Sequence, residues 1–143
     1  MHQPFTVQDL YLHHKVIELH CAPGVDLAAC TVRSVDRDND SYVSHLWAFR
    51  LDGSMGHQMT QGTGLDQSPR WSPNGDRLAF ISGRSGGAPQ VHVMQRDGGE
   101  ARQLGSFDES VTLIQWTASA FDEGHILPTA DVKSPSVGPR RGL

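Results

Sequence analysis

The chain has 143 residues, of which 37% are hydrophobic, and it carries a formal net charge of -4 at pH 7. This balance argues against nucleic acid and anionic membrane surfaces as partners, because both require a basic footprint. No run approaches the about 20 apolar residues of a membrane-spanning helix, and the first residues lack the basic and apolar regions of a signal peptide, so we expect a cytoplasmic protein.

The first predicted element is a short helix in an N-terminal lead-in segment, residues 1–15. Thr6 precedes the apolar Leu10 and Leu12, and Asp9 follows Thr6 by three positions. A threonine followed three positions later by an acidic residue can satisfy free N–H groups where a helix begins.

Three histidines and a cysteine follow this helix: His13, His14, His20 and Cys21. The adjacent His13 and His14 would point to different faces, whereas a structural zinc site takes four ligands from paired knuckles. We therefore predict neither a metal nor a cofactor, and we interpret these residues as part of the transition from helix to strand.

Residues 16–62 are predicted to form a degenerate first blade of four antiparallel strands. Runs rich in strand-forming residues are separated by turn residues. These runs are residues 16–21, 27–35, 44–51 and 57–59. The first hairpin is expected to place Cys21 opposite Cys30, so a cross-strand disulfide is geometrically conceivable, but core packing is favoured in a reducing compartment.

The segment 36–40, Asp-Arg-Asp-Asn-Asp, begins like a calcium-binding loop. An EF-hand loop needs glycine at its sixth position and glutamate at its twelfth, where this chain has Ser41 and Trp47. We therefore interpret the segment as a solvated hairpin loop.

Residues 63–105 are predicted to form a second blade that repeats the first. Trp71 and Trp116 lie 45 positions apart. The first hairpin of the first blade aligns with that of the second blade at an offset of 50. Further pairs at an offset of 45 are Asp52 with Asp97, Gly53 with Gly98, and Gln58 with Gln103; pairs at an offset of 50 are Pro23 with Pro73 and Ala29 with Ala79. A period near 45 in four-stranded units is typical of β-propeller blades. In this blade the hairpin is expected to place Trp71 opposite Phe80.

Residues 106–120 are predicted to begin a third blade with a strand at 111–116. The small residues 118–120 then replace the turn of the earlier repeats, and we expect no second strand of the usual kind. Residues 121–143 are predicted to be an irregular or disordered tail, since 128–143 contain three prolines. The predicted fold is therefore all-β, an incomplete β-propeller of about two blades plus the first strand of a third.

One segment, Gly83-Arg84-Ser85-Gly86-Gly87, satisfies the G-x-S-x-G pattern of a nucleophile elbow. That chemistry needs a strand before the serine and a helix directly after it, whereas Ala88-Pro89 leads into another predicted strand. We interpret the glycines as a hairpin loop and predict no catalytic residue in this chain. Gly62-Thr63-Gly64 likewise lacks the third glycine and the helix of a dinucleotide loop.

The run 69–82, which contains Trp71-Ser72-Pro73-Asn74-Gly75, resembles the propeller repeat whose core is Trp-Ser-Pro-Asp-Gly. That repeat occurs in Tol-system propellers and in the prolyl oligopeptidase family of serine peptidases, and Asn74 stands where the repeat usually has Asp. The N-terminal third, with Val7-Gln8-Asp9-Leu10 and Ser44-His45-Leu46-Trp47, is similar to the start of the acylaminoacyl-peptidase and dipeptidyl-peptidase branch.

This resemblance implies a non-catalytic propeller portion that gates substrate access to a separate hydrolase domain, and it implies a chain truncated before that domain. The alternative is a standalone Tol-like protein-interaction module. Either implies a protein or peptide partner, and uncovered blade faces favour self-association. We expect Trp47, Trp71 and Trp116 to be partly exposed on such faces.

Overall fold

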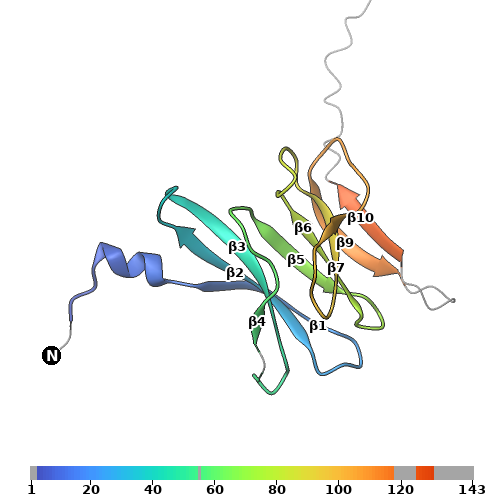
Figure 1. Cartoon of the computed structure of the whole chain (residues 1–143), viewed down its shortest axis with the longest axis horizontal. Helices are drawn as coiled ribbons and strands as arrows, with labels where there is room; N and C mark the ends of the chain where they lie inside the picture. Colours follow the sequence, from blue (N-terminus) through green and yellow to red (C-terminus); the bar gives the residue numbers. More distant parts are fainter. Residues whose placement is uncertain (1–2, 55, 118–124, 131–143) are drawn as a thin grey trace, which may run out of the picture.

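A computed structural model describes residues 3–54, 56–117 and 125–130 of the chain. Its elements follow one another as η1 (Val7–Leu12), β1 (Lys15–Cys21), β2 (Ala28–Asp36), β3 (Ser41–Phe49), β4 (His57–Gln58), β5 (Asp66–Trp71), β6 (Arg77–Ser82), β7 (Gln90–Gln95), β8 (Arg102–Gln103), β9 (Val111–Thr117) and β10 (His125–Ala130). The regular secondary structure of the described residues is therefore almost all strand, with one short helix outside the sheets (Figure 1).

The strands form two four-stranded antiparallel sheets with the same internal order. One sheet runs β1-β2-β3-β4 and the other runs β5-β6-β7-β8, so sequential strands are always neighbours (Figure 1). Each sheet is a meander of the kind that forms a propeller blade. The structure confirms the predicted all-β class and the two blades.

A third sheet pairs β9 with β10 in antiparallel register. The strand at 111–117 agrees with the predicted start of a third blade, but β10 lies where an irregular tail was predicted. The prediction is wrong for His125–Ala130, and a second strand does follow the first strand of the third blade, because β9 supplies backbone partners to this segment. The rest of the predicted tail, 131–143, lies outside the described residues.

The two first hairpins turn one residue earlier than predicted. Trp71 pairs with Leu78 rather than with Phe80, because the backbone N–H of Ser72 donates to Arg77 O at 2.8 Å and closes a four-residue loop. The first blade has the same closure, with Ala22 N–H donating to Leu27 O at 2.8 Å. The offset of 50 between the two hairpins is therefore confirmed, although the predicted pair is not.

The same shift separates the two cysteines. Cys21 pairs with Ala28, and Cys30 pairs with Leu19, so the expected Cys21–Cys30 pair is wrong. Both thiols are free; Cys30 is buried and Cys21 is exposed. The expectation of core packing is therefore confirmed for Cys30 and wrong for Cys21.

The main hydrophobic core lies between the two blades. Blade 1, comprising β1 to β4, contributes mostly small side chains, and blade 2, comprising β5 to β8, contributes large ones. The buried members are Ala22, Ala29, Leu46 and Ala48 from blade 1 and Trp71, Leu78, Phe80 and Met94 from blade 2. Trp71 is only 2% exposed, so the expectation that it would be partly bare is wrong, whereas Trp47 and Trp116 are half-buried. A second core joins the opposite face of blade 2 to β9.

The turns of the two blades also meet. Gly75 has a φ of +73°, and a Cβ built on it would lie 3.0 Å from Val25 Cγ2 in the turn of blade 1. Glycine is needed here for two reasons, since the left-handed backbone strains other residues and the neighbouring turn leaves little room for a side chain.

The N-terminal helix is a 3₁₀ helix of six residues whose side chains are not buried. Asp9 Oδ2 accepts from the Thr6 backbone N–H at 2.6 Å and from the Thr6 hydroxyl at 2.8 Å. The predicted pairing of Thr6 with Asp9 is confirmed. The two bonds cap the start of a short 3₁₀ helix, and no α-helix forms here.

Candidate functional site

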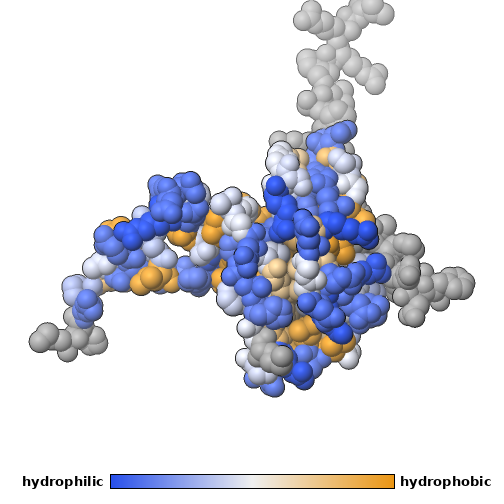
Figure 2. All heavy atoms as spheres, viewed as in Figure 1, coloured by the Kyte–Doolittle hydropathy of each residue, from blue (hydrophilic) through white to orange (hydrophobic). Residues whose placement is uncertain are grey.

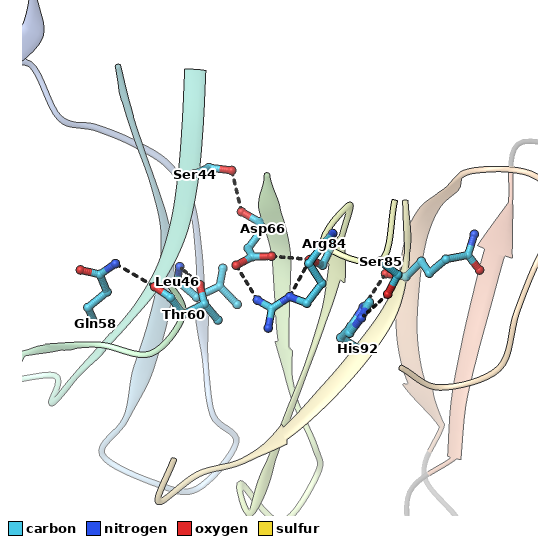
Figure 3. Close-up of polar contacts among 10 residues, drawn as sticks. Ser44, Leu46, Gln58, Thr60, Asp66, Arg84, Ser85 and His92 are labelled. Atoms are coloured by element: carbon cyan, nitrogen blue, oxygen red, sulfur yellow. Dashed lines mark hydrogen bonds and ion pairs between the residues drawn. The ribbon is translucent and has the colours of Figure 1, made fainter. Parts of the chain in front are cut away.

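A buried polar cluster lies where β5 and β6 pair, at one end of blade 2 (Figure 3). Asp66, whose side chain is 3% exposed, accepts from Ser82 Oγ at 2.5 Å and from Arg84 Nη2 at 2.7 Å. Arg84 Nε also donates to Ser82 Oγ at 2.9 Å. A buried carboxylate is stable when paired and hydrogen-bonded in this way.

The same cluster connects blade 2 to blade 1. Ser44 Oγ on β3 donates to the Asp66 backbone carbonyl at 2.8 Å, and Ser44 forms an isolated parallel bridge with Leu65 (Figure 3). Within blade 1, Thr60 Oγ1 accepts from the Leu46 backbone N–H at 2.9 Å. The contacts of Ser44 therefore align the two blades at this end of the interface.

Ser85, the serine of the G-x-S-x-G segment, lies beside His92 on β7 (Figure 3). The distance from Ser85 Oγ to His92 Nε2 is 3.3 Å, and His92 Nδ1 lies 3.3 Å from the Gln90 carbonyl oxygen. Only an N–H can face a carbonyl, so Nδ1 carries the proton and Nε2 can accept from the serine hydroxyl. Sequence reasoning missed this pair because the partners come from a loop and a strand seven positions apart.

Burial chiefly lowers the pKa of His92, and its ring stacks on Phe80 with centroids 5.8 Å apart. The guanidinium carbon of Arg84 also lies 5.1 Å from the centre of the Phe80 ring. His92 is thus a neutral, packed ring at neutral pH.

Within the described residues, no carboxylate is hydrogen-bonded to His92 and no helix follows Ser85, as a serine hydrolase site would require. The group that orients His92 is a backbone carbonyl, while the Asp66 carboxylate is engaged by Ser82 and Arg84. Ser85 lies between β6 and β7, so the helix that supports a nucleophile elbow is replaced by a strand. The geometry favours a hydrogen bond that fixes the hairpin loop.

A second group of polar and aromatic side chains lines a hollow of about 460 Å³ beside β1, β5 and β9, the first strands of the three sheets. Arg70 pairs with Glu18 at 2.6 Å, and its carbonyl accepts from Trp116 Nε1 at 2.8 Å. His20 Nδ1 accepts from the Trp71 backbone N–H at 3.2 Å. These bonds tie the three first strands together.

The histidines and cysteine considered as metal ligands are not brought together. His20 is engaged by Trp71, and His13 packs edge-on against Phe5 with centroids 5.9 Å apart. Within residues 3–54, 56–117 and 125–130 there is no group of three or more His, Cys, Asp or Glu side chains that could hold a metal ion. Over the same ranges, no helix is long and apolar enough to cross a membrane.

The loop between β2 and β3 is held by its own aspartate. Asp36 Oδ1 accepts from the Asp38 backbone N–H at 3.0 Å, and Asp36 Oδ2 accepts from Asn39 Nδ2 at 2.7 Å. These bonds are those of a side-chain-stabilised turn.

The chain is similar in sequence to segments of a bacterial peptidase and of TolB proteins. The uncharacterized peptidase YuxL of Bacillus subtilis is 34% identical over 117 residues, covering 82% of this chain and 18% of the relative. A TolB homolog of Chlorobium luteolum is 36% identical over 72 residues, covering 50% of this chain and 15% of the relative. The chain is similar to a segment of each protein. It spans less than a fifth of the length of either protein.

Two further proteins are similar to part of this chain. Tricorn protease homolog 1 of Streptomyces coelicolor is 35% identical over 74 residues, which is 51% of this chain and 7% of the relative. A solved TolB structure from Agrobacterium tumefaciens aligns with a TM-score of 0.47 at 23% identity, over 58% of this chain and 28% of that one. No family model matches the sequence.

Proposed function

We propose that this chain is a non-catalytic propeller portion of a prolyl oligopeptidase-type serine peptidase, where it restricts the substrates that reach a hydrolase domain. The observation that carries the proposal is the 34% identity to a peptidase over 82% of the chain. The match includes most of this chain but only 18% of the relative. A hydrolase domain would lie in the part of the relative that the match leaves uncovered.

The site geometry supports a structural role for the one serine–histidine pair. A nucleophilic serine needs a base that is oriented and charge-stabilised, together with donors for the oxyanion. In this chain His92 faces a carbonyl, and the Asp66 carboxylate is already paired with Arg84. We therefore expect the purified chain not to react with a fluorophosphonate probe, and Ser85→Ala to leave that result unchanged.

A chimera tests the gating role. The segment of the Bacillus subtilis peptidase that aligns with this chain would be replaced by the aligned residues of this chain, and hydrolysis of short peptides would be compared with hydrolysis of unfolded casein. We expect the chimera to cleave short peptides and to exclude casein, as the parent peptidase would. Cleavage of casein by the chimera, or labelling of the isolated chain that Ser85→Ala abolishes, would contradict the proposal.

A protein-interaction module is the second candidate, and the 36% identity to a TolB homolog over half of the chain favours it. Such a module would bind a protein through loops at one end of its blades. It predicts that the chimera is folded but inactive on short peptides, and that the isolated chain forms a defined complex with one partner of its host. The short-peptide assay therefore separates the two candidates.

A further inference from the structure

A hollow of about 680 Å³ lies between η1, the start of β1 and the outer ends of β2 and β3. Its volume falls within the roughly 300–1,000 Å³ that is typical of small-ligand sites. Val7, Leu10, Val16 and Tyr42 contribute to its wall, and each of these side chains is at least 50% exposed. In the space-filling view, hydrophobic residues reach the surface beside the η1 arm (Figure 2). Exposed apolar side chains gathered around a hollow mark a binding surface.

Two cations face each other in this hollow. Lys15 on β1 pairs directly with Arg33 on β2, and both residues line the wall. Like charges directly opposite on neighbouring strands repel. Over the described ranges no carboxylate lies within ion-pair distance of either side chain, whereas Arg70 and Arg84 have carboxylates at 2.6 Å and 2.7 Å.

Arg33 is also short of a hydrogen-bond acceptor. Its Nε is buried and has no partner, while its guanidinium carbon lies 5.8 Å from the centre of the Tyr42 ring. The contact with Tyr42 holds the guanidinium group but accepts none of its planar N–H bonds. That buried nitrogen is closed to the hollow, so an anion there would instead meet Lys15 and the part of Arg33 that lines the wall, two cations without a carboxylate partner among the described residues, and would be bound favourably.

We propose that this hollow binds the C-terminal carboxylate of a short peptide whose last residue is apolar. Asp40 is the one acidic residue on the wall, so the lysine and the arginine leave an excess of positive charge. In a C-terminal residue the carboxylate and the side chain share one carbon, which suits a site where cations adjoin apolar walls. The choice of a peptide rests on the function proposed above, while the anion site rests on Lys15 and Arg33 alone.

Isothermal titration calorimetry of the whole chain tests this proposal with acetyl-Ala-Leu-Phe as the free acid, the same peptide as its C-terminal amide, and inorganic phosphate. We expect the free acid to bind at least tenfold more tightly than the amide, and more tightly than phosphate. Arg33→Gln should weaken the free acid at least tenfold, and Arg96→Gln, which removes a charge on blade 2, should leave its affinity unchanged.

A stability measurement separates binding from a structural role. Because Lys15 and Arg33 repel each other, Arg33→Gln is expected to melt at a temperature no lower than that of the parent chain. Equal affinity for acid and amide, tighter binding of phosphate, unchanged affinity in Arg33→Gln, or a lower melting temperature of that variant would overturn the proposal. The peptidase chimera does not depend on this binding result, so failure here leaves the proposed function standing.

Discussion

Asp66 is the residue whose chemistry most clearly serves the fold. Asp66→Asn keeps the shape of the side chain but replaces a carboxylate oxygen with an N–H donor that faces Arg84 or Ser82. We expect the variant to lose about 1–3 kcal/mol of unfolding free energy, because buried donors are left without an acceptor. Urea denaturation followed by tryptophan fluorescence measures this loss.

Asp97→Asn is the matched control, since Asp97 is 94% exposed and lies 3.8 Å from Arg96. An exposed ion pair contributes less than about 1 kcal/mol, so this control should be close to the parent chain. Equal stability of the two variants would show that the Asp66 cluster is not important for the fold.

The two engaged histidines predict how stability depends on pH. Burial is the main cause that lowers the pKa of His20 and of His92 below the ordinary value of 6.5. The native state then binds fewer protons than the unfolded state, so the free energy of unfolding is complete above pH 6.5 and falls as the pH drops below it.

The measurement is urea denaturation at several pH values between about 7 and 5, a window that lies above the titration of ordinary carboxylates. The double variant His20→Gln, His92→Gln should show a flatter dependence than the parent chain. A parent chain of constant stability across this window would contradict the lowered pKa values.

The sequence predicted the Thr6–Asp9 pairing because both partners lie within one turn of helix. It did not predict the Ser85–His92 contact or the Lys15–Arg33 opposition, because these depend on which strand positions share a register. Alternation of residue types suggests which face a side chain occupies, but the partner on the next strand is set by the turn.

At the scale of elements, the turn between β5 and β6 determines both register and blade contact. The runs of β-branched and aromatic residues predicted where the strands lie. They did not predict the register, because Trp71 pairs with Leu78 and not with Phe80. The sequence Pro-Asn-Gly-Asp is compatible with either centre for the hairpin, and the bond from Ser72 N–H to Arg77 O selects the earlier one.

Gly75→Ala tests the contact between the turns. The substitution places a methyl group 3.0 Å from Val25 Cγ2 and also strains a φ of +73°. Gly53→Ala is the control, because its φ is +83° and nothing lies within 4 Å of the added Cβ. We expect Gly53→Ala to cost about 1 kcal/mol from strain alone and Gly75→Ala to cost distinctly more in thermal denaturation. Equal losses would mean that the turns do not touch.

At the scale of the whole molecule, blade 1 has one face that blade 2 covers and another that is open to solvent. Leu19 on the open face is 54% exposed, and Ile17 beside it is 43% exposed. In blade 2 the corresponding face is buried against blade 1. We therefore propose that the purified chain self-associates through the open face of blade 1.

Sedimentation velocity at increasing concentration tests this association. Leu19→Glu should shift the chain toward monomer, and Leu51→Glu, which changes a 55% exposed leucine in a turn, should not. A parent chain that remains monomeric at every concentration would exclude the association.

The repeat period predicted the blades because each blade is one meander with local connections. The blade interface could not be predicted to the same degree, since it depends on large side chains of blade 2 filling space left by alanines of blade 1. That complementarity buries Trp71. The prediction that Trp71 is partly exposed considered only the uncovered faces of the blades.

The central claim is that the two sheets pack face to face as consecutive blades. The most direct test is a nuclear Overhauser measurement between a Val25 methyl group and the α protons of Gly75 in the labelled chain. We predict a strong cross-peak, because Val25 Cγ2 lies 3.0 Å from the position of a Gly75 Cβ. Well-formed strands in both sheets without that cross-peak would contradict the claim.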